Sequence, residues 1–132
     1  MPDRKAPAKA LTVLTLVFAL ALPTIAWASS YVTTLDYTWR VFGTTRSYTH
    51  DDMNLTGTFA TTDGSTGTHT ATLWRDRTWP LSDQNLGSRT LLRKGYSNVD
   101  WYDVGAGNYY FNFLKSEDGV RVYCNSLSLY CN

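Results

Sequence analysis

The chain has 132 residues, with twelve basic and eleven acidic side chains, and 14% of its residues are aromatic. This length fits one domain, and so balanced a charge disfavours a nucleic-acid partner, which needs a basic face, and electrostatic docking on anionic lipid. After residue 28 the chain is rich in Thr, Tyr, Val, Phe and Trp but has only one Glu, a composition that favours pleated, half-buried strands.

Residues 1–28 have the organisation of a secretory signal peptide. Three basic residues precede an apolar run over 11–22, Pro23 ends that run, and Ala26-Trp27-Ala28 supplies a small-x-small cleavage site. We predict a helical signal peptide over 1–28, cleavage before Ser29 and a secreted, extracellular domain over 29–132. An uncleaved membrane anchor is the less favoured alternative, because a spanning helix needs about 20 apolar residues.

Removal of residues 1–28 takes away three of the twelve basic residues and one of the eleven acidic ones. The remaining 104 residues carry nine basic and ten acidic side chains, a formal charge of −1. That is enough chain for one domain to bury its own core. We expect no nucleic-acid partner, and no membrane partner after signal cleavage.

Export to an oxidising compartment makes Cys124 and Cys131 candidates for a disulfide. Seven residues of straight strand span about 23 Å, whereas a disulfide holds its Cα atoms within about 7 Å. A bridge therefore requires the chain to double back over 125–128. We expect the bridge, and the alternative is a continuous last strand whose two thiols are free or form intermolecular bonds.

Strand signals recur about every ten residues, as is typical of a β-sandwich or barrel. The predicted strands cover residues 37–42, 44–49, 55–61, 68–75, 89–94, 109–114 and 120–125. We predict one hairpin between 55–61 and 68–75 across Asp63-Gly64 and another between 109–114 and 120–125. The predicted fold is a single antiparallel β-sandwich, of jelly-roll or immunoglobulin-like type.

Alternation is clearest between residues 109 and 114. Tyr109, Phe111 and Phe113 point one way, and Tyr110, Asn112 and Leu114 point the other. We expect the first three side chains to face the core, which would protect the register of this strand against a one-residue slip.

Part of the C-terminal half of the chain resembles a known group of proteins. The resemblance rests on the segment Trp101–Phe113, with Lys115, Asp118-Gly119 and Leu129-Tyr130. This part of the chain resembles the C-terminal half of small secreted β-sandwich proteins of Gram-positive bacteria, with their pattern W-x-x-V-x-x-G-x-Y-Y-F. The resemblance implies a bacterial origin, export and an all-β fold. It brings no catalytic residue and does not support the Cys124–Cys131 bridge.

Catalytic motifs are missing from the sequence. The histidines are His50 and His69, and there is no G-x-S-x-G, S-x-x-K or H-E-x-x-H motif. The loop over 50–54 offers oxygen ligands of the kind that Ca²⁺ takes, but its spacing matches no EF-hand. We predict that the protein is not an enzyme and that it holds neither a metal nor another cofactor.

Aromatic residues in predicted loops are the main candidates for ligand binding. Trp79 lies beside Pro80, and Trp101-Tyr102 is flanked by Asp100 and Asp103. Exposed rings stack on sugars or form interface hot spots, and the two carboxylates suit sugar hydroxyls. We predict that these five residues bind ligand. The alternative is that the rings fill the core and the carboxylates are simply solvated.

These observations favour a secreted, non-catalytic binding module. Its partner would be a cell-wall or extracellular polysaccharide, or another protein. The alternative function is a secreted antimicrobial protein of bacteriocin type, or an inhibitor of a foreign enzyme. Exposed, aligned aromatic rings would favour glycan binding, whereas burial of all of them would leave the function to the loops.

Overall fold

The structure is a computed structural model that describes residues 29–132, so the predicted signal peptide lies outside the described residues. The described residues contain no helix and form strands only. These are β1 (Ser30–Tyr37), β2 (Arg40–Phe42), β3 (Arg46–Tyr48), β4 (Met53–Thr61), β5 (Thr68–Arg75), β6 (Gln84–Leu92), β7 (Gly95–Trp101), β8 (Gly107–Leu114) and β9 (Val122–Cys131). Over 29–132, nothing is helical and apolar for long enough to cross a membrane.

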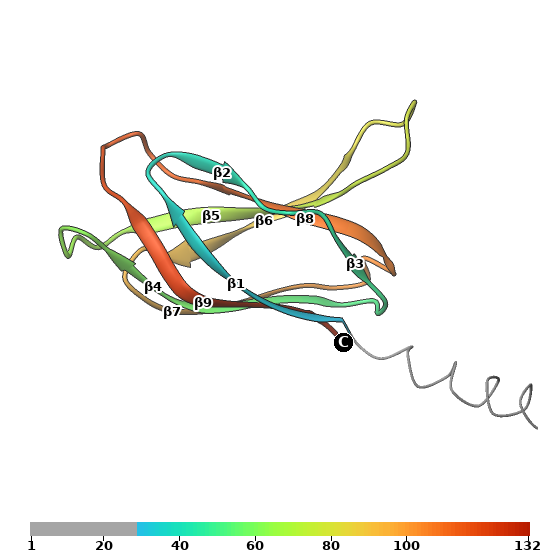
Figure 1. Ribbon diagram of the computed structural model, residues 1–132, viewed down its shortest axis with the longest axis horizontal. Helices are drawn as coiled ribbons and strands as arrows, with labels where there is room; N and C mark the ends of the chain where they lie inside the picture. Colours follow the sequence, from blue (N-terminus) through green and yellow to red (C-terminus); the bar gives the residue numbers. More distant parts are fainter. Residues whose placement is uncertain (1–28) are drawn as a thin grey trace, which may run out of the picture.

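The strands form two antiparallel sheets. Sheet A has the order β1-β9-β4-β7, and sheet B has the order β2-β8-β5-β6, with β3 also paired to β8. Figure 1 shows the two sheets as the two layers of a sandwich. The predicted all-β, two-sheet antiparallel architecture is therefore confirmed.

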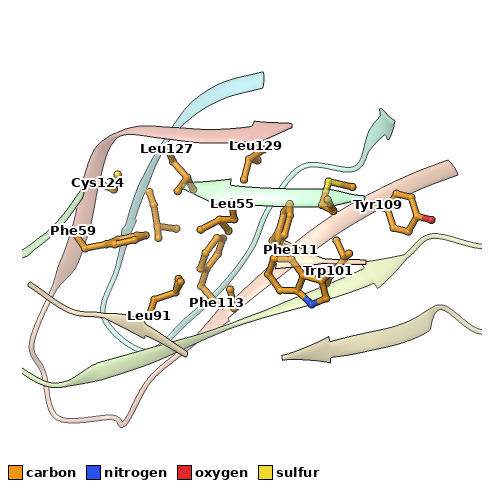
Figure 2. Close-up of a cluster of buried hydrophobic side chains, with 14 of the residues drawn as sticks. Leu55, Phe59, Leu91, Trp101, Tyr109, Phe111, Phe113, Cys124, Leu127 and Leu129 are labelled. Atoms are coloured by element: carbon orange, nitrogen blue, oxygen red, sulfur yellow. The ribbon is translucent and has the colours of Figure 1, made fainter. Parts of the chain in front are cut away.

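The core lies between the sheets and is built by strand alternation. Tyr109, Phe111 and Phe113 of β8 are at most 3% exposed, which confirms their predicted orientation. From sheet A, Leu127 and Leu129 of β9 project toward them (Figure 2). Alternate residues of β8, and half of the residues of β9, thus contribute to one shared core.

Both predicted hairpins are wrong. Strand β4 lies in sheet A and β5 in sheet B, so the turn at Asp63-Gly64 leads from one sheet to the other. The same holds for β8 and β9, which belong to sheets B and A respectively. The physical reason is that alternation identifies the face that a strand buries. It does not identify the sheet, because both sheets bury their inner faces against the same core.

Strand β9 contains one residue more than the strands on either side of it. Against β1, Thr33 pairs with Leu127 and Leu35 pairs with Cys124, so one residue opposes Asn125 and Ser126. The pairing with β4 shifts at the same place. This β-bulge changes the parity of the strand. Cys124 and Leu127, on the two sides of the bulge, therefore both point inward although they are an odd number of residues apart.

The predicted disulfide is also wrong. Cys124 and Cys131 are both free and buried. Cys124 pairs with Leu35 of β1, and Cys131 pairs with Met53 of β4, at separate points of one continuous strand. The chain does not double back over 125–128, and the bulge turns both thiols into the core without bringing them together.

Candidate ligand-binding face

The five sequence-predicted binding residues do not form one site. Trp79 lies in the loop between β5 and β6 and is 88% exposed. This loop extends beyond one end of the sandwich (Figure 1). Within residues 29–132, no hydrogen bond or ring contact joins Trp79 to the other four.

Trp101 is not on the surface, so its predicted contact with a ligand is wrong. It ends β7 and is 1% exposed. Its indole Nε1 donates to the carbonyl oxygen of Gly87 at 2.9 Å, and its ring lies 5.5 Å from that of Phe111. The side chain fills the core between the two sheets.

The structure brings Asp100 and Tyr102 together, but not Asp103. The Tyr102 hydroxyl lies 3.4 Å from Asp100 Oδ2, and Asp100 Oδ1 accepts a hydrogen bond from Asn54 Nδ2 at 2.8 Å. Asp103 is exposed in the following loop with a positive φ of 56°. Its amide donates to Asp52 Oδ1 at 2.9 Å. Asp103 therefore shapes the loop through its backbone.

The histidines and acidic residues of the described chain form no metal-binding cluster, and His69 is enclosed in the core. His69 is buried between the Tyr37 hydroxyl, 2.6 Å from Nδ1, and the Leu92 carbonyl oxygen, 3.1 Å from Nε2. Burial lowers the pKa of His69 to about 4, and the ring is neutral at pH 7. Over residues 29–132, no group of three or more His, Cys, Asp or Glu side chains is placed to hold a metal ion.

Three aromatic side chains, which we call the aromatic row, follow one another across the outer face of sheet B: Phe42, Tyr110 and Trp74. Trp74 of β5 and Tyr110 of β8 are paired in register. Their ring planes are 4° from parallel, with centroids 6.4 Å apart. The Phe42 ring on edge strand β2 lies 6.3 Å from that of Tyr110. Phe42 is 57% exposed, and the other two are half-buried.

A cation extends the aromatic row at the β2 edge. The guanidinium of Arg40 lies 5.8 Å from the Phe42 centroid and 4.7 Å from that of Trp39. Trp39 is 44% exposed. Arg40 thus sits against two exposed rings, in the arrangement of a cation–π contact, and has N–H groups to offer to ligand oxygens.

Tyr110 is held by its hydroxyl. The hydroxyl donates to Asp83 Oδ2 at 2.7 Å, and Asp83 Oδ1 accepts from the Arg77 amide at 3.2 Å. Burial, and then the bond to Asp83, raise the pKa of Tyr110 to about 12. The same bond lowers the pKa of Asp83. At neutral pH the pair is a neutral phenol bound to a carboxylate, which fixes the orientation of the central ring.

Two buried polar atoms on this face have no hydrogen-bond partner within the described part of the chain: Trp74 Nε1 and Asn112 Oδ1. Asn112 is in register with Phe42 on one side and Thr72 on the other. Buried polar groups are normally paired, and here one is a donor and the other an acceptor. A hydroxyl group is able to satisfy both.

Alternation in the sequence predicts that two members of the aromatic row, Tyr110 and Trp74, face away from the core. Tyr110 and Asn112 are the side chains predicted to face away from Phe111, and Trp74 has the same relation to the buried Leu73. The missing information was strand order. The row exists because β2, β8 and β5 are neighbours, although they lie far apart in the sequence.

Comparisons with known proteins assign no family. No family model matches the chain. A 38-residue segment is 45% identical to fibronectin type III domain-containing protein 7 of Mus musculus and of Homo sapiens. The match covers 29% of this chain and only 5% of each of those proteins. The resemblance to secreted proteins of Gram-positive bacteria stays a prediction.

Several solved structures are similar at low identity. They include the periplasmic g-type lysozyme inhibitor PliG of Aeromonas hydrophila, with 10% identity, a TM-score of 0.45 and coverage of 77% of this chain and 85% of that one. The family 11 carbohydrate-binding module of Clostridium thermocellum has 7% identity and a TM-score of 0.44, with coverage of 78% and 85%. A family 36 carbohydrate-binding module bound to calcium and xylotriose has 12% identity and a TM-score of 0.40, with coverage of 77% and 91%.

Proposed function

We propose that this protein is a secreted, non-catalytic module that binds extracellular or cell-wall polysaccharide on the outer face of sheet B. The observation that carries the proposal is the aromatic row, in which three rings on adjacent strands lie 6.3 and 6.4 Å apart on the outer face of one sheet. The predicted signal peptide supports export, and the near-neutral charge disfavours nucleic acid as the ligand that stacks on these rings.

The chemistry of the aromatic row suits a sugar chain. A pyranose ring presents apolar C–H faces and hydroxyl edges, and aromatic side chains combine a flat apolar body with nearby polar groups. The unpaired Trp74 Nε1 and Asn112 Oδ1 offer a donor and an acceptor, and small side-chain movements would let a hydroxyl reach them. Because the rings lie on strands and not on loops, the surface is formed before the ligand arrives.

Adsorption to insoluble polysaccharides tests the proposal. Purified protein is incubated with cellulose, chitin, xylan and bacterial cell wall, and the unbound fraction is measured. We expect binding to at least one of these, and at least tenfold weaker binding for Phe42→Ala and Trp74→Ala, because a few aromatic residues carry most of the binding energy of such an interface. Phe42 is exposed, so its removal leaves the core intact.

Tyr96→Ala is the matched control. Tyr96 is 60% exposed on β7, in the other sheet, so its loss should change adsorption less than twofold. The proposal fails if the parent protein adsorbs to none of the polysaccharides, or if Tyr96→Ala weakens adsorption as much as Phe42→Ala. Loss of adsorption in Trp79→Ala and Tyr102→Ala alone would move the site to the loops.

The alternative function, an antimicrobial protein or enzyme inhibitor, has one observation in its favour. Trp79 and Leu81 are 88% and 60% exposed in the loop between β5 and β6. Arg77 closes the base of that loop, since its Nε donates to the Ser82 carbonyl oxygen at 2.6 Å. A loop that is closed at its base and carries an exposed Trp suits insertion into a cleft of another protein. Growth or amylase inhibition that Trp79→Ala abolishes, without any polysaccharide binding, would favour this function.

A further inference from the structure

A pocket of about 310 Å³ opens at one edge of the sandwich, where β1 faces the segment that joins β2 to β3. Its floor consists of core side chains from both sheets. Figure 2 shows Phe111 and Phe113 from sheet B opposite Leu127 and Leu129 from sheet A. The rim is polar and contains the threonines at positions 33, 34 and 44. The volume lies at the lower end of about 300–1,000 Å³, the range of ligand sites.

The pocket exists because both edges lack a large inward side chain at the same place. On β1, the position that pairs with Leu127 is Thr33. On the facing edge, residues 43–45 separate β2 from β3. The Gly43 amide donates to the Phe111 carbonyl oxygen at 2.7 Å, which holds this link against β8. Gly43 has no side chain to cover the core, and Thr44 is exposed.

Of the two charged residues that line the pocket, Arg46 and Asp36, only Asp36 has an ion-pair partner in the described chain. Arg46 lines the pocket, and its guanidinium lies over the Tyr31 ring, 5.0 Å from the centroid. None of the salt bridges found within residues 29–132 involves Arg46. Asp36, the other charged residue of the lining, is neutralised by two hydrogen bonds from Arg121. A ligand in the pocket thus meets an apolar floor and one unpaired cation.

We propose that this pocket binds a small amphiphilic monoanion, such as a medium-chain carboxylate. The apolar chain lies against Phe111, Phe113 and Leu127, in the space that Thr33 and Gly43 leave open. The carboxylate pairs with Arg46, whose planar fork of N–H donors matches it. The pocket opens at the β1 edge, and of the aromatic row it shares only Phe42.

Calorimetric titration of the full protein with decanoate and with decanol tests this proposal. The two probes share an apolar chain and differ in charge. We expect one decanoate per chain with sub-millimolar affinity. Arg46→Gln should weaken decanoate at least tenfold and change decanol less than twofold. Lys94→Gln removes an exposed cation outside the pocket and should leave decanoate binding unchanged.

Thr33→Trp fills the pocket and should abolish binding of both probes. Circular dichroism shows whether this variant folds, and the comparison of Arg46→Gln with Lys94→Gln does not depend on it. Three results overturn the proposal: no decanoate binding to the parent protein, equal weakening by the two charge variants, or full binding by a folded Thr33→Trp. Polysaccharide adsorption by Arg46→Gln should equal that of the parent, which separates this site from the aromatic row.

Discussion

Individual side chains show which contacts can be predicted from local sequence spacing and which cannot. Asp100 and Tyr102 come together because they are two residues apart, so the sequence indicates their proximity directly. Trp101 behaves differently, because the Gly87 carbonyl oxygen that accepts its indole N–H lies on another strand, 14 residues earlier. A Trp is buried readily when its N–H finds a partner. That partner depends on the packing of β6 against β7, which local alternation does not specify.

His69 is a second residue whose role follows from its partners. It is 2% exposed, and Arg93 and Lys115 lie near enough to add to the effect of burial on its pKa. Both cations are themselves paired with Asp118, at 2.7 and 2.5 Å. With Nε2–H donating to Leu92 O and Nδ1 accepting from the Tyr37 hydroxyl, the neutral ring is fully satisfied, and protonation would break this arrangement.

Stability should therefore fall in mildly acidic solution. The pKa of His69 is about 4 in the folded protein, against 6.5 for the ordinary group. The folded state binds this proton less readily, so the contribution of His69 is complete above pH 6.5 and is lost as the pH falls toward 4. We expect the free energy of unfolding to drop by about 2–3 kcal/mol between pH 7.5 and 4.5, as measured by urea denaturation.

His69→Gln is the control for this pH dependence. Its amide reproduces one donor and one acceptor but does not titrate, so its stability should be nearly flat over the same interval. Four carboxylates have lowered pKa values and therefore titrate below this pH interval: those of Asp36, Asp63, Asp83 and Asp118. An equal drop in parent and variant would show that another group is responsible.

At the scale of strands, the sequence predicts orientation better than partnership. Alternation correctly places Tyr109, Phe111 and Phe113 in the core. It fails for the hairpins, because a turn such as Asp63-Gly64 serves equally well for a crossing between sheets. The aromatic row could not be predicted from the sequence for the same reason. Its members are on β2, β5 and β8, and only the strand order makes them neighbours.

The bulge in β9 needs a glycine on the strand beside it. A Cβ at Gly57 of β4 would lie 3.0 Å from Cys124 Sγ and 3.1 Å from Leu127 Cδ1. These are the two inward residues that flank the bulge at 125–126. Gly57→Ala should therefore lower the free energy of unfolding by about 1–3 kcal/mol through overpacking, as measured by chemical denaturation.

Thr58→Ala is the neighbouring control. Thr58 is exposed on the same strand, and its loss should change stability by about 0.5 kcal/mol or less. Equal stability of Gly57→Ala and the parent would mean that β9 is able to move away from β4, and that the bulge is not held at this place by close packing.

Within residues 29–132 no disulfide links the two sheets, which are held together by core packing and by hydrogen bonds such as those of Trp101 and His69. Its two cysteines are separate core residues, Cys124 next to β1 and Cys131 next to β4. Each sheet combines strands from distant parts of the chain, so the core forms only when both sheets are assembled. For a domain of this size a disulfide is not required, because its own buried surface is sufficient.

The melting temperature should therefore be the same with and without a reducing agent. Ellman's reagent should react with two thiols per chain in guanidinium chloride and with almost none in the native protein, since both residues are at most 1% exposed. Mass spectrometry under non-reducing conditions supplies the control, because a bridged form is two hydrogens lighter. A lower melting temperature on reduction would contradict the free, buried state of the two thiols.

The extra residue of β9 has a consequence for how this chain varies among organisms. Residues 127, 129 and 131 face the core in spite of their odd spacing from Cys124 because Asn125 and Ser126 together oppose one residue of β1. Loss of one of these two residues would convert the bulge to regular pairing, in which the same three side chains still face inward. Homologous sequences aligned over 122–131 should therefore include chains that are one residue shorter at 125–126.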